Sequence, residues 1–530
     1  MSESKIIKNS AYMAFGTIIS RVTGVVRSAA IIAAIGFGPF ADAYSIANSL
    51  PTIIYIVIIG GAINSIFVPQ LVKHQKSDPD EGKSFSDKLL TFVIIILLSL
   101  SAIAVLLAPL IIKVYSPENW TQENFEVSVL FARFLLPQIF FYGLFAVLQQ
   151  VLNARGHFAI PMYAPIANNL VVTVTALLFL NVAANPPVAG IVSTSAIYLL
   201  AVGTTLGIAV QALVLIPVLK KVNYQFRFNF AFKNSGLGLA SKLAIWTFGY
   251  VVVNQLTYVL ITRLAAGANV SQSDIGFTAY QNAYLIFMLP HSIIAVSLVT
   301  ALLPRFSNLA TEQGKNDLVF EIKRSINTLL FLLLPIAALL ASLAPSATAI
   351  LFARGSASLE NSISTGFVLS AFLIGLVPFS IFYLLLRGFY ALDDTKTPFI
   401  FNVFLNLIHI TTAVLLYNSL SGNNRIVGLA ISLVISYLLV TPVMYFRLMK
   451  KIAVRNKSNL GTIKIIISAL ILVLSLSVFN YFYAFYLPDT SFVNNIFNIL
   501  LVGIFGTFIY LFFSFVFRVN ELKYLSRLFK

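Results

Sequence analysis

Hydrophobic residues along this chain form long runs that are separated by short polar stretches. A run of about 20 apolar residues is long enough to cross a hydrocarbon core of about 30 Å as a helix. Fourteen such runs follow one another, and their short connections are typical of antiparallel neighbours in a helical bundle. The pattern predicts an all-α, polytopic membrane protein. The approximate limits of the runs are 9–34, 41–70, 89–114, 126–152, 158–182, 190–219, 243–266, 276–304, 325–353, 362–390, 398–417, 424–446, 465–487 and 494–517.

The composition agrees with this pattern. The chain is 59% hydrophobic and only 10% charged, whereas a soluble protein carries roughly 25% charged residues. Cysteine is absent, which excludes disulfides, thiolate metal sites and a catalytic thiol. The four histidines are scattered without metal-ligand spacing, and none of the common nucleotide-binding or hydrolase motifs is present. We therefore expect a transporter rather than an enzyme, without cofactor or metal.

The net charge of +17 would fit a nucleic-acid partner, but the distribution of the charge indicates otherwise. If the fourteen runs alternate in direction, 28 of the 35 Lys and Arg residues fall on the side of the N-terminus. Basic loops mark the cytoplasmic side of a membrane protein. We therefore expect both termini in the cytoplasm and no nucleic-acid partner. One missed or additional span would destroy this bias, so the count of fourteen is self-consistent.

The chain also contains an internal repeat. The segment VLNARGHFAIPMYAPIANN at 151–169 resembles GFYALDDTKTPFIFNVFLN at 388–406, with Pro161 aligned on Pro398 at an offset of 237 residues. Both copies run in the same direction across the membrane. Duplicated halves around a midplane site are typical of alternating-access transporters, although chance similarity between apolar segments is an alternative. The repeat predicts an N-terminal lobe at 1–230 with six spans, a C-terminal lobe at 231–450 with six spans, and two extra helices at 451–530.

Charged residues inside the first two runs mark the candidate site. Arg21 and Arg27 lie within the first run and Asp42 opens the second, with no other charged residue between Lys8 and Lys73. Charges at membrane depth are costly and usually line a polar cavity or pair with one another. The guanidinium group cannot be neutralised by deprotonation, and its planar fork suits a carboxylate or a phosphate. The two arginines therefore indicate an anionic substrate.

The spacing of the two arginines raises a geometric question. Six residues rotate a straight helix by about 120°, so the two side chains would not share one face. Either the cavity is wide, or the helix bends at Gly24. Asp42 could pair with one arginine while the site is empty. The competing interpretation is that Arg21, Arg27 and Asp42 only hold the protein together.

Other charged residues are weaker candidates for the site. Arg133 lies within a span, whereas we expect Arg263 to extend to the outer surface. Asp393, Asp394 and Lys396 stand at a span end, where we expect them to form a turn and a helix cap.

Five segments of the chain carry a resemblance to a known family, namely SRVTGVVR at 20–27, FGPFADAYSIANSLP at 37–51, FVPQLV at 67–72, LFARGSAS at 351–358 and GFYALDDTKTP at 388–398. They resemble the MurJ/MviN family of lipid II flippases, in the multidrug/oligosaccharidyl-lipid/polysaccharide exporter superfamily. The resemblance implies two lobes around a cationic cavity and alternating access that moves undecaprenyl-pyrophosphate-linked peptidoglycan precursor outward across the bacterial cytoplasmic membrane. It implies that the two C-terminal helices form a groove for the lipid tail, and that Arg21, Arg27 and Asp42 are functional.

The chain departs from the best-known members of that family in two places. Tyr55 stands where those members carry an arginine, and Tyr284 and Leu285 stand where they carry an Asp-Arg pair. The resemblance therefore implies a cavity that is less cationic than in those members. Neutral side chains could supply hydrogen bonds to the substrate instead, and the candidates are Tyr44, Asn48, Tyr55, Tyr280, Gln281 and Asn282.

Four functions remain open at this stage. The first is a lipid II flippase, whose substrate-binding residues would be Arg21, Arg27, Asp42, Asn48 and Tyr55. The second is a flippase for another lipid-linked oligosaccharide, and the third is a multidrug/cation antiporter of the same superfamily. The fourth is a membrane scaffold without transport activity. The expected partners are lipid II and membrane lipids, the protein is expected to be a monomer, and the driving force is either the membrane potential or a counter-ion.

Overall fold

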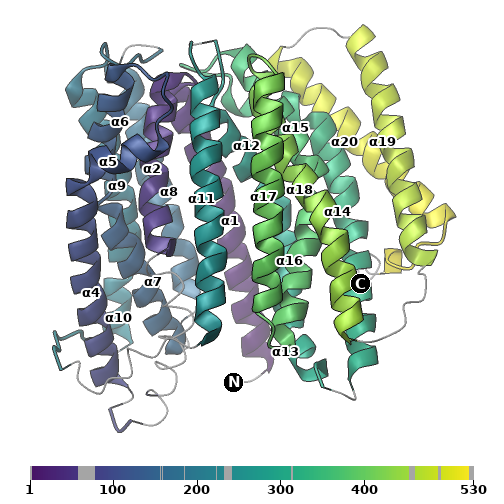
Figure 1. Cartoon of the computed structure of the whole chain (residues 1–530), viewed down its shortest axis with the longest axis horizontal. Helices are drawn as coiled ribbons and strands as arrows, with labels where there is room; N and C mark the ends of the chain where they lie inside the picture. The colour runs from purple at the N-terminus through teal and green to yellow at the C-terminus, as the bar shows by residue number, and fades with distance from the viewer. Residues whose placement is uncertain are drawn as a thin grey trace. The chain divides into compact units, whose positions relative to one another are not determined.

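The computed structural model describes residues 3–57, 74, 78–80, 82–155, 157, 159–183, 186–222, 224–231, 242–271, 273–311, 314–452, 460–486 and 491–523. Within these residues the regular structure is helical and contains no strand (Figure 1). Among the described residues, twelve helices are long and apolar enough to cross a membrane, or thirteen if the bent pair α15 and α16 is one span. Part of the predicted second span, residues 58–70, lies outside the described residues. The predicted fold class, an all-α polytopic membrane protein, is confirmed.

The chain divides into two compact units. The first unit comprises residues 1–272 together with the short segment Arg354–Ala357. Its helix α11, which the sequence assigns to the second lobe, packs here against α2 and α5. The helices of this unit are α1 (Glu3–Ile35), α2 (Pro39–Tyr55), α4 (Lys83–Leu106), α5 (Ala108–Tyr115), α6 (Gln122–Leu135), α7 (Gln138–Ala154), α8 (Ala159–Val182), α9 (Thr194–Leu213), α10 (Ile216–Lys221) and α11 (Lys242–Ala268).

The second unit comprises residues 273–353 and 358–530. Its helices are α12 (Phe277–Pro290), the π-helical turn η3 (His291–Ala295), α13 (Val296–Leu309), α14 (Lys315–Phe352), α15 (Leu359–Ile374), α16 (Leu376–Ala391), α17 (Lys396–Ser419), α18 (Asn424–Ile452), α19 (Leu460–Tyr486) and α20 (Phe492–Val516). The long helix α14 packs against α15, α16, α19 and α20, so it forms the centre of this unit.

Helix boundaries in the two units support the predicted repeat. Helix α8 begins at 159 and ends at 182, and α17 begins at 396 and ends at 419, so both ends are displaced by the same 237 residues. The N-caps of α6 and α15, Thr121 and Ser358, are separated by the same distance, and each side-chain oxygen accepts a bond from the amide three residues later. In each unit the following span is interrupted, after Leu135 in one and at Gly375 in the other. The two units thus share a local sequence of caps and breaks.

The last two helices attach to α14 through polar contacts. Asn480 Nδ2 of α19 donates to Ser342 Oγ at 2.7 Å. Asn498 Nδ2 of α20 donates to Ser346 Oγ at 3.1 Å. Hydrogen bonds between helices are worth about 1 kcal/mol each in a membrane, where packing cannot gain from the hydrophobic effect. These bonds fix α19 and α20 against one face of α14.

The segment Arg354–Ala357 follows α14 in the chain but packs onto the C-terminal end of α1. Ser356 N donates to Ala33 O at 2.7 Å, and Ser356 Oγ donates to Ala34 O at 2.9 Å. These bonds satisfy carbonyls that a helix end otherwise leaves without partners. Gly355 has φ +59°, and a Cβ atom there would lie 2.3 Å from Ala33 O. Only glycine therefore fits at this position.

The turn between α16 and α17 confirms the predicted cap. Asp394 Oδ1 accepts from Thr397 N at 2.8 Å, and Asp394 Oδ2 accepts from Thr397 Oγ1 at 2.7 Å and from Lys451 Nζ. Asp393 precedes it in the left-handed region at φ +54°. Partial burial raises the pKa of the Asp394 carboxyl. The bonds from Lys451 and Thr397 together lower this pKa by more than burial raises it, so the pKa lies below its ordinary value of 3.8.

Replacing Asp394 with alanine should lower the free energy of unfolding by about 1–2 kcal/mol, because α17 loses its cap. A carboxyl whose pKa is lowered by folding stabilises the folded state at pH values above its unfolded-state pKa. This contribution disappears only as the pH falls through the folded-state pKa. The difference from the wild type should therefore stay constant between pH 5 and pH 8 in thermal unfolding of the detergent-solubilised protein. Asp393→Asn removes the same charge and tolerates the left-handed backbone. An equal loss in that control would contradict the cap.

Candidate functional site

Helix α1 carries both arginines, and α8 holds it in place. Asn169 Nδ2 of α8 donates to Ser20 O at 3.1 Å and to Thr23 Oγ1 at 2.9 Å. A Cβ atom on Gly16 would lie 2.9 Å from the ring of Tyr163, so the two helices approach closely at this point. Small residues and interhelical hydrogen bonds are the usual means of packing helices in membranes. These contacts with α8 therefore hold in place the part of α1 from which the charged side chains extend.

The two arginines have no counter-charge among the residues that the structure describes. Arg21 is exposed and Arg27 is half-buried. Neither forms an ion pair within the described part of the chain, and Arg27 Nε is buried without a hydrogen-bond partner there. Because α1 continues without interruption through Gly24, the two side chains leave the helix in directions about 120° apart. A bound anion can therefore meet the two guanidinium groups only if the cavity is wide.

Asp42 has a different partner from the one expected. Its side chain is fully buried, and Oδ2 accepts a bond from Asn269 Nδ2 at 2.9 Å. Asn269 Nδ2 also donates to Phe37 O at 2.8 Å. The expected pairing with Arg21 or Arg27 is not found among the described residues. Asp42 instead stands in the first turn of α2, where a carboxylate is favoured by the helix dipole, and joins this turn to the segment that follows α11.

The neutral candidates on α2 divide into two groups. Asn48 is half-buried. Tyr55 is half-buried as well, and its ring stacks on Tyr142 with centroids 6.4 Å apart. Tyr44 does not fit the expectation, because it is only 2% exposed and its hydroxyl bonds Thr204 Oγ1 at 3.0 Å. Tyr44 therefore packs α2 against α9 and is not available to a substrate.

In the second unit, α12 carries the remaining candidates. Tyr280 is buried, and its ring lies 5.0 Å from that of Phe372. Tyr284 also contacts Phe372, at 5.5 Å, so an aromatic cluster occupies the position where the family resemblance leads us to expect a charged pair. Asn282 Nδ2 donates to a carbonyl of its own helix at 2.8 Å, and Gln281 is half-buried. The residues of α12 thus offer a largely aromatic surface.

Arg263 and Arg133 lie away from this site. Arg263 Nη1 donates to the Val114 carbonyl at 3.2 Å and to the Lys113 carbonyl at 3.4 Å, so it caps the C-terminal end of α5. Its side chain is 34% exposed, which agrees with the expected extension to the surface. Arg133 is exposed near the end of α6. Both residues can therefore be compared with Arg21 and Arg27 as arginines outside the candidate site.

Sequence reasoning missed the importance of Asn269. Its amide is only 2% exposed and forms the link between Asp42 and the end of α11. In the sequence it is a single polar residue after a small-residue stretch, AAGAN, that resembles any loop at the end of a span. Only the close approach of two segments more than 200 positions apart in the chain shows its role.

Comparisons with known proteins agree with this architecture. The family model described as lipid II flippase MurJ matches residues 31–512. A probable lipid II flippase MurJ from Haemophilus influenzae is 27% identical over 397 residues, which cover 72% of this chain and 75% of that protein. The lipid II flippase MurJ of Burkholderia cenocepacia is 28% identical over 389 residues, which cover 72% of each chain.

Solved structures show the same fold. A lipid II flippase MurJ in an inward closed conformation superposes with a TM-score of 0.73 at 22% identity, covering 96% of this chain and 99% of that one. An inward-facing multidrug resistance MATE transporter of the MOP superfamily gives a TM-score of 0.62 at 15% identity, covering 83% and 98%. The chain thus shares its fold with that transporter, whereas the family model covers residues 31–512 of the sequence. The chain belongs to the lipid II flippase MurJ family.

Proposed function

We propose that this chain moves lipid II, an undecaprenyl-pyrophosphate-linked peptidoglycan precursor, from the cytoplasmic to the outer leaflet of the bacterial inner membrane. Membership of the lipid II flippase family and the many membrane-spanning helices support this function. The task is transport, because the lipid is moved without a change in its covalent structure.

The Arg27 guanidinium, whose Nε has no partner among the described residues, carries the assignment of the site. A pyrophosphate-linked sugar cannot enter hydrocarbon unless polar groups replace its hydration. Arg27 lies on a membrane span, and its Nε is buried without a partner within the described residues. Nε has therefore lost its water, and the guanidinium gains strongly from a charge-assisted bond to phosphate. In this proposal Arg27 and Arg21 receive the pyrophosphate.

Other residues of α2 complete the proposed site. Asn48 and Tyr55 are half-buried and offer neutral hydrogen bonds to the head group. Asp42 acts indirectly, because its bond to Asn269 fixes the first turn of the helix that carries them. The polyprenyl tail remains in the membrane while the two units alternate in access, and the protein acts as a monomer driven by the membrane potential or by a counter-ion.

Depletion of the protein from its own host tests this function. We expect lipid II to accumulate on the cytoplasmic face and to disappear from the outer face, as measured by its accessibility to a membrane-impermeant probe. Normal amounts on the outer face would reject the proposal. A second arm compares binding of lipid II with binding of another undecaprenyl-pyrophosphate-linked glycan to the purified protein. Preference for the second ligand would move the assignment to that glycan.

A further inference from the structure

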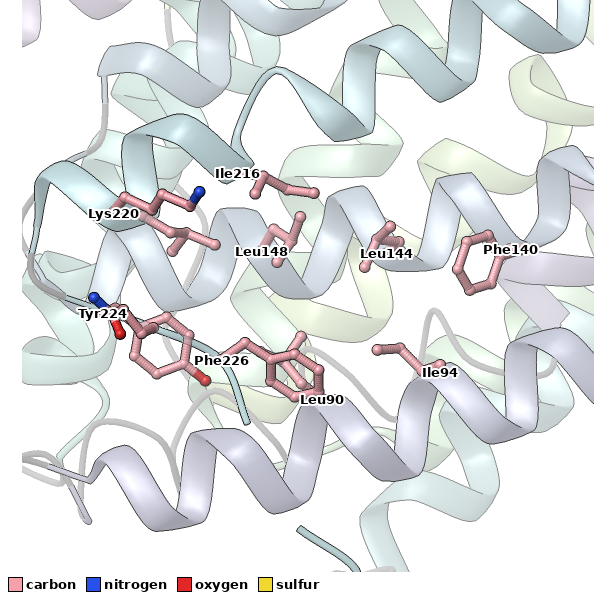
Figure 2. Close-up of a pocket in the computed structure, with 11 residues that line it drawn as sticks. Leu90, Ile94, Phe140, Leu144, Leu148, Ile216, Lys220, Tyr224 and Phe226 are labelled. Atoms are coloured by element: carbon pink, nitrogen blue, oxygen red, sulfur yellow. The ribbon is translucent and has the colours of Figure 1, made fainter. Parts of the chain in front are cut away.

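The first unit contains a cavity formed by α4, α7, α10 and the residues after α10 (Figure 2). Its volume is about 580 Å³. In Figure 2, Lys220 and Tyr224 lie at one end, and Ile94 and Phe140 lie at the other. The wall between the two ends is apolar. None of the lining residues comes from α1 or α2, so this cavity is separate from the arginine site.

The segment at 224–231, which we name the strap, contributes Tyr224, Gln225 and Phe226 to the lining of the cavity. Tyr224 hydroxyl donates to Asp87 Oδ1 of α4 at 2.7 Å, and Asn229 N donates to Thr91 Oγ1 of α4 at 2.9 Å. The Arg155 guanidinium lies 4.5 Å from the centre of the Tyr224 ring. Burial raises the pKa of Tyr224, and its bond to Asp87 raises that pKa further, so the hydroxyl remains a neutral donor. The strap is therefore fixed to α4.

The polar end of the cavity is positively charged. Lys220 lines the cavity, is exposed, and forms no ion pair with any residue that the structure describes. Lys221 follows it directly in the chain, and Arg227 lies seven residues after Lys220. The carboxylate of Asp87 accepts bonds from the Tyr224 hydroxyl and the Arg227 amide. The distribution of basic residues predicts that this end faces the cytoplasm. The lysine is thus available to an external anion at the membrane surface.

The apolar wall matches a hydrocarbon chain. Leu90, Leu144 and Leu148 line it from α4 and α7, and Ile216 lines it from α10. Ile216 is 39% exposed, so the wall continues onto the membrane-facing surface. On the strap, Phe228 and Phe230 are 63% and 66% exposed beside Arg227. Exposed aromatic rings beside basic residues are typical of the level of the lipid head groups.

We propose that this cavity binds one anionic glycerophospholipid of the cytoplasmic leaflet. The lipid phosphate lies against Lys220, and one acyl chain extends past Leu148 and Leu144 toward Phe140. A positive end joined to an apolar wall complements an anionic head joined to a chain, whereas a soluble anion would leave the wall unfilled. The bound lipid fastens α7 to α4 and α10 in the first unit.

Native mass spectrometry of the full-length protein tests the charged end. After delipidation, phosphatidylglycerol or phosphatidylethanolamine is added back, and the dissociation constant of the first bound lipid is measured for each. One lysine near an anionic lipid surface strengthens binding about fivefold. Lys220→Gln should therefore weaken phosphatidylglycerol binding by this factor, with little effect on the binding of phosphatidylethanolamine. Lys221→Gln removes the same charge from a residue that does not line the cavity. Equal losses in both variants would indicate general surface attraction and overturn the proposal.

A second pair of variants tests the apolar wall. Ile216→Trp places a large side chain into the cavity from an exposed position and should abolish retention of the lipid. Leu213→Trp adds the same side chain at a position that is 46% exposed and does not line the cavity. Retention of phosphatidylglycerol by Ile216→Trp would reject the site. Displacement by undecaprenyl phosphate at equal concentration would show that the cavity prefers a polyprenyl chain, which would also overturn the proposal.

Discussion

Replacing Arg27 with alanine should reduce lipid II export by at least about 30-fold, because removal of one partner of a desolvated charge pair costs about 2–5 kcal/mol. The guanidinium is half-buried on α1, and its Nε lacks a partner within the described part of the chain. Its interaction with a pyrophosphate would therefore be made in a water-poor site. Export is measured as the rate at which lipid II reaches the outer face in a host depleted of the wild-type protein.

Two further variants separate the role of Arg27 from general effects of charge. Arg133→Ala removes an exposed arginine of α6 and should export at the wild-type rate. Arg27→Lys keeps the charge but loses the planar fork, so we expect a rate between the wild type and the alanine variant. If Arg27→Ala, present in the membrane at wild-type amounts, exports normally, then α1 does not hold the head group.

Replacing Gly366 with valine should lower the free energy of unfolding by about 3 kcal/mol, at the upper end of the usual cost of overpacking. A Cβ atom on Gly366 of α15 would lie 2.4 Å from Pro345 Cα and 2.7 Å from Pro345 N of α14. These are backbone atoms, so no side-chain rotation relieves the contact. The variant should show a lower thermal unfolding midpoint in detergent and a smaller yield from membranes.

Gly503→Val is the matched control for this prediction. Gly503 also lies within a helix, α20, but a Cβ atom there would meet no atom within 4 Å. Both variants carry the same β-branched residue, so the helix-propensity cost is the same in each. Equal midpoints for the two variants would contradict the close approach of α14 and α15.

The sequence predicts the spans well, because a long apolar run indicates a membrane-spanning helix whichever other segments it contacts. It also predicts the repeat, since Pro161 and Pro398 occupy the same position near the beginning of α8 and of α17. The contacts between distant segments were not predictable. The partner of Asp42 and the burial of Tyr44 depend on which helices meet, and hydropathy does not encode that choice. The candidate arginines could be singled out from the sequence because charged residues within an apolar run are rare, and their role in substrate binding stays a prediction.

The attachment of Arg354–Ala357 to α1 has a consequence for biosynthesis. Ser356 Oγ and its acceptor Ala34 O are 322 positions apart in the chain. At translation rates of about 5–20 residues per second, roughly 16–64 s pass between the synthesis of the two partners. During that interval the C-terminal carbonyls of α1 lack this partner, and synthesis of the rest of the first unit, up to residue 272, is completed before the partner is made. The first unit therefore reaches its final form only after α14 of the second unit has left the ribosome.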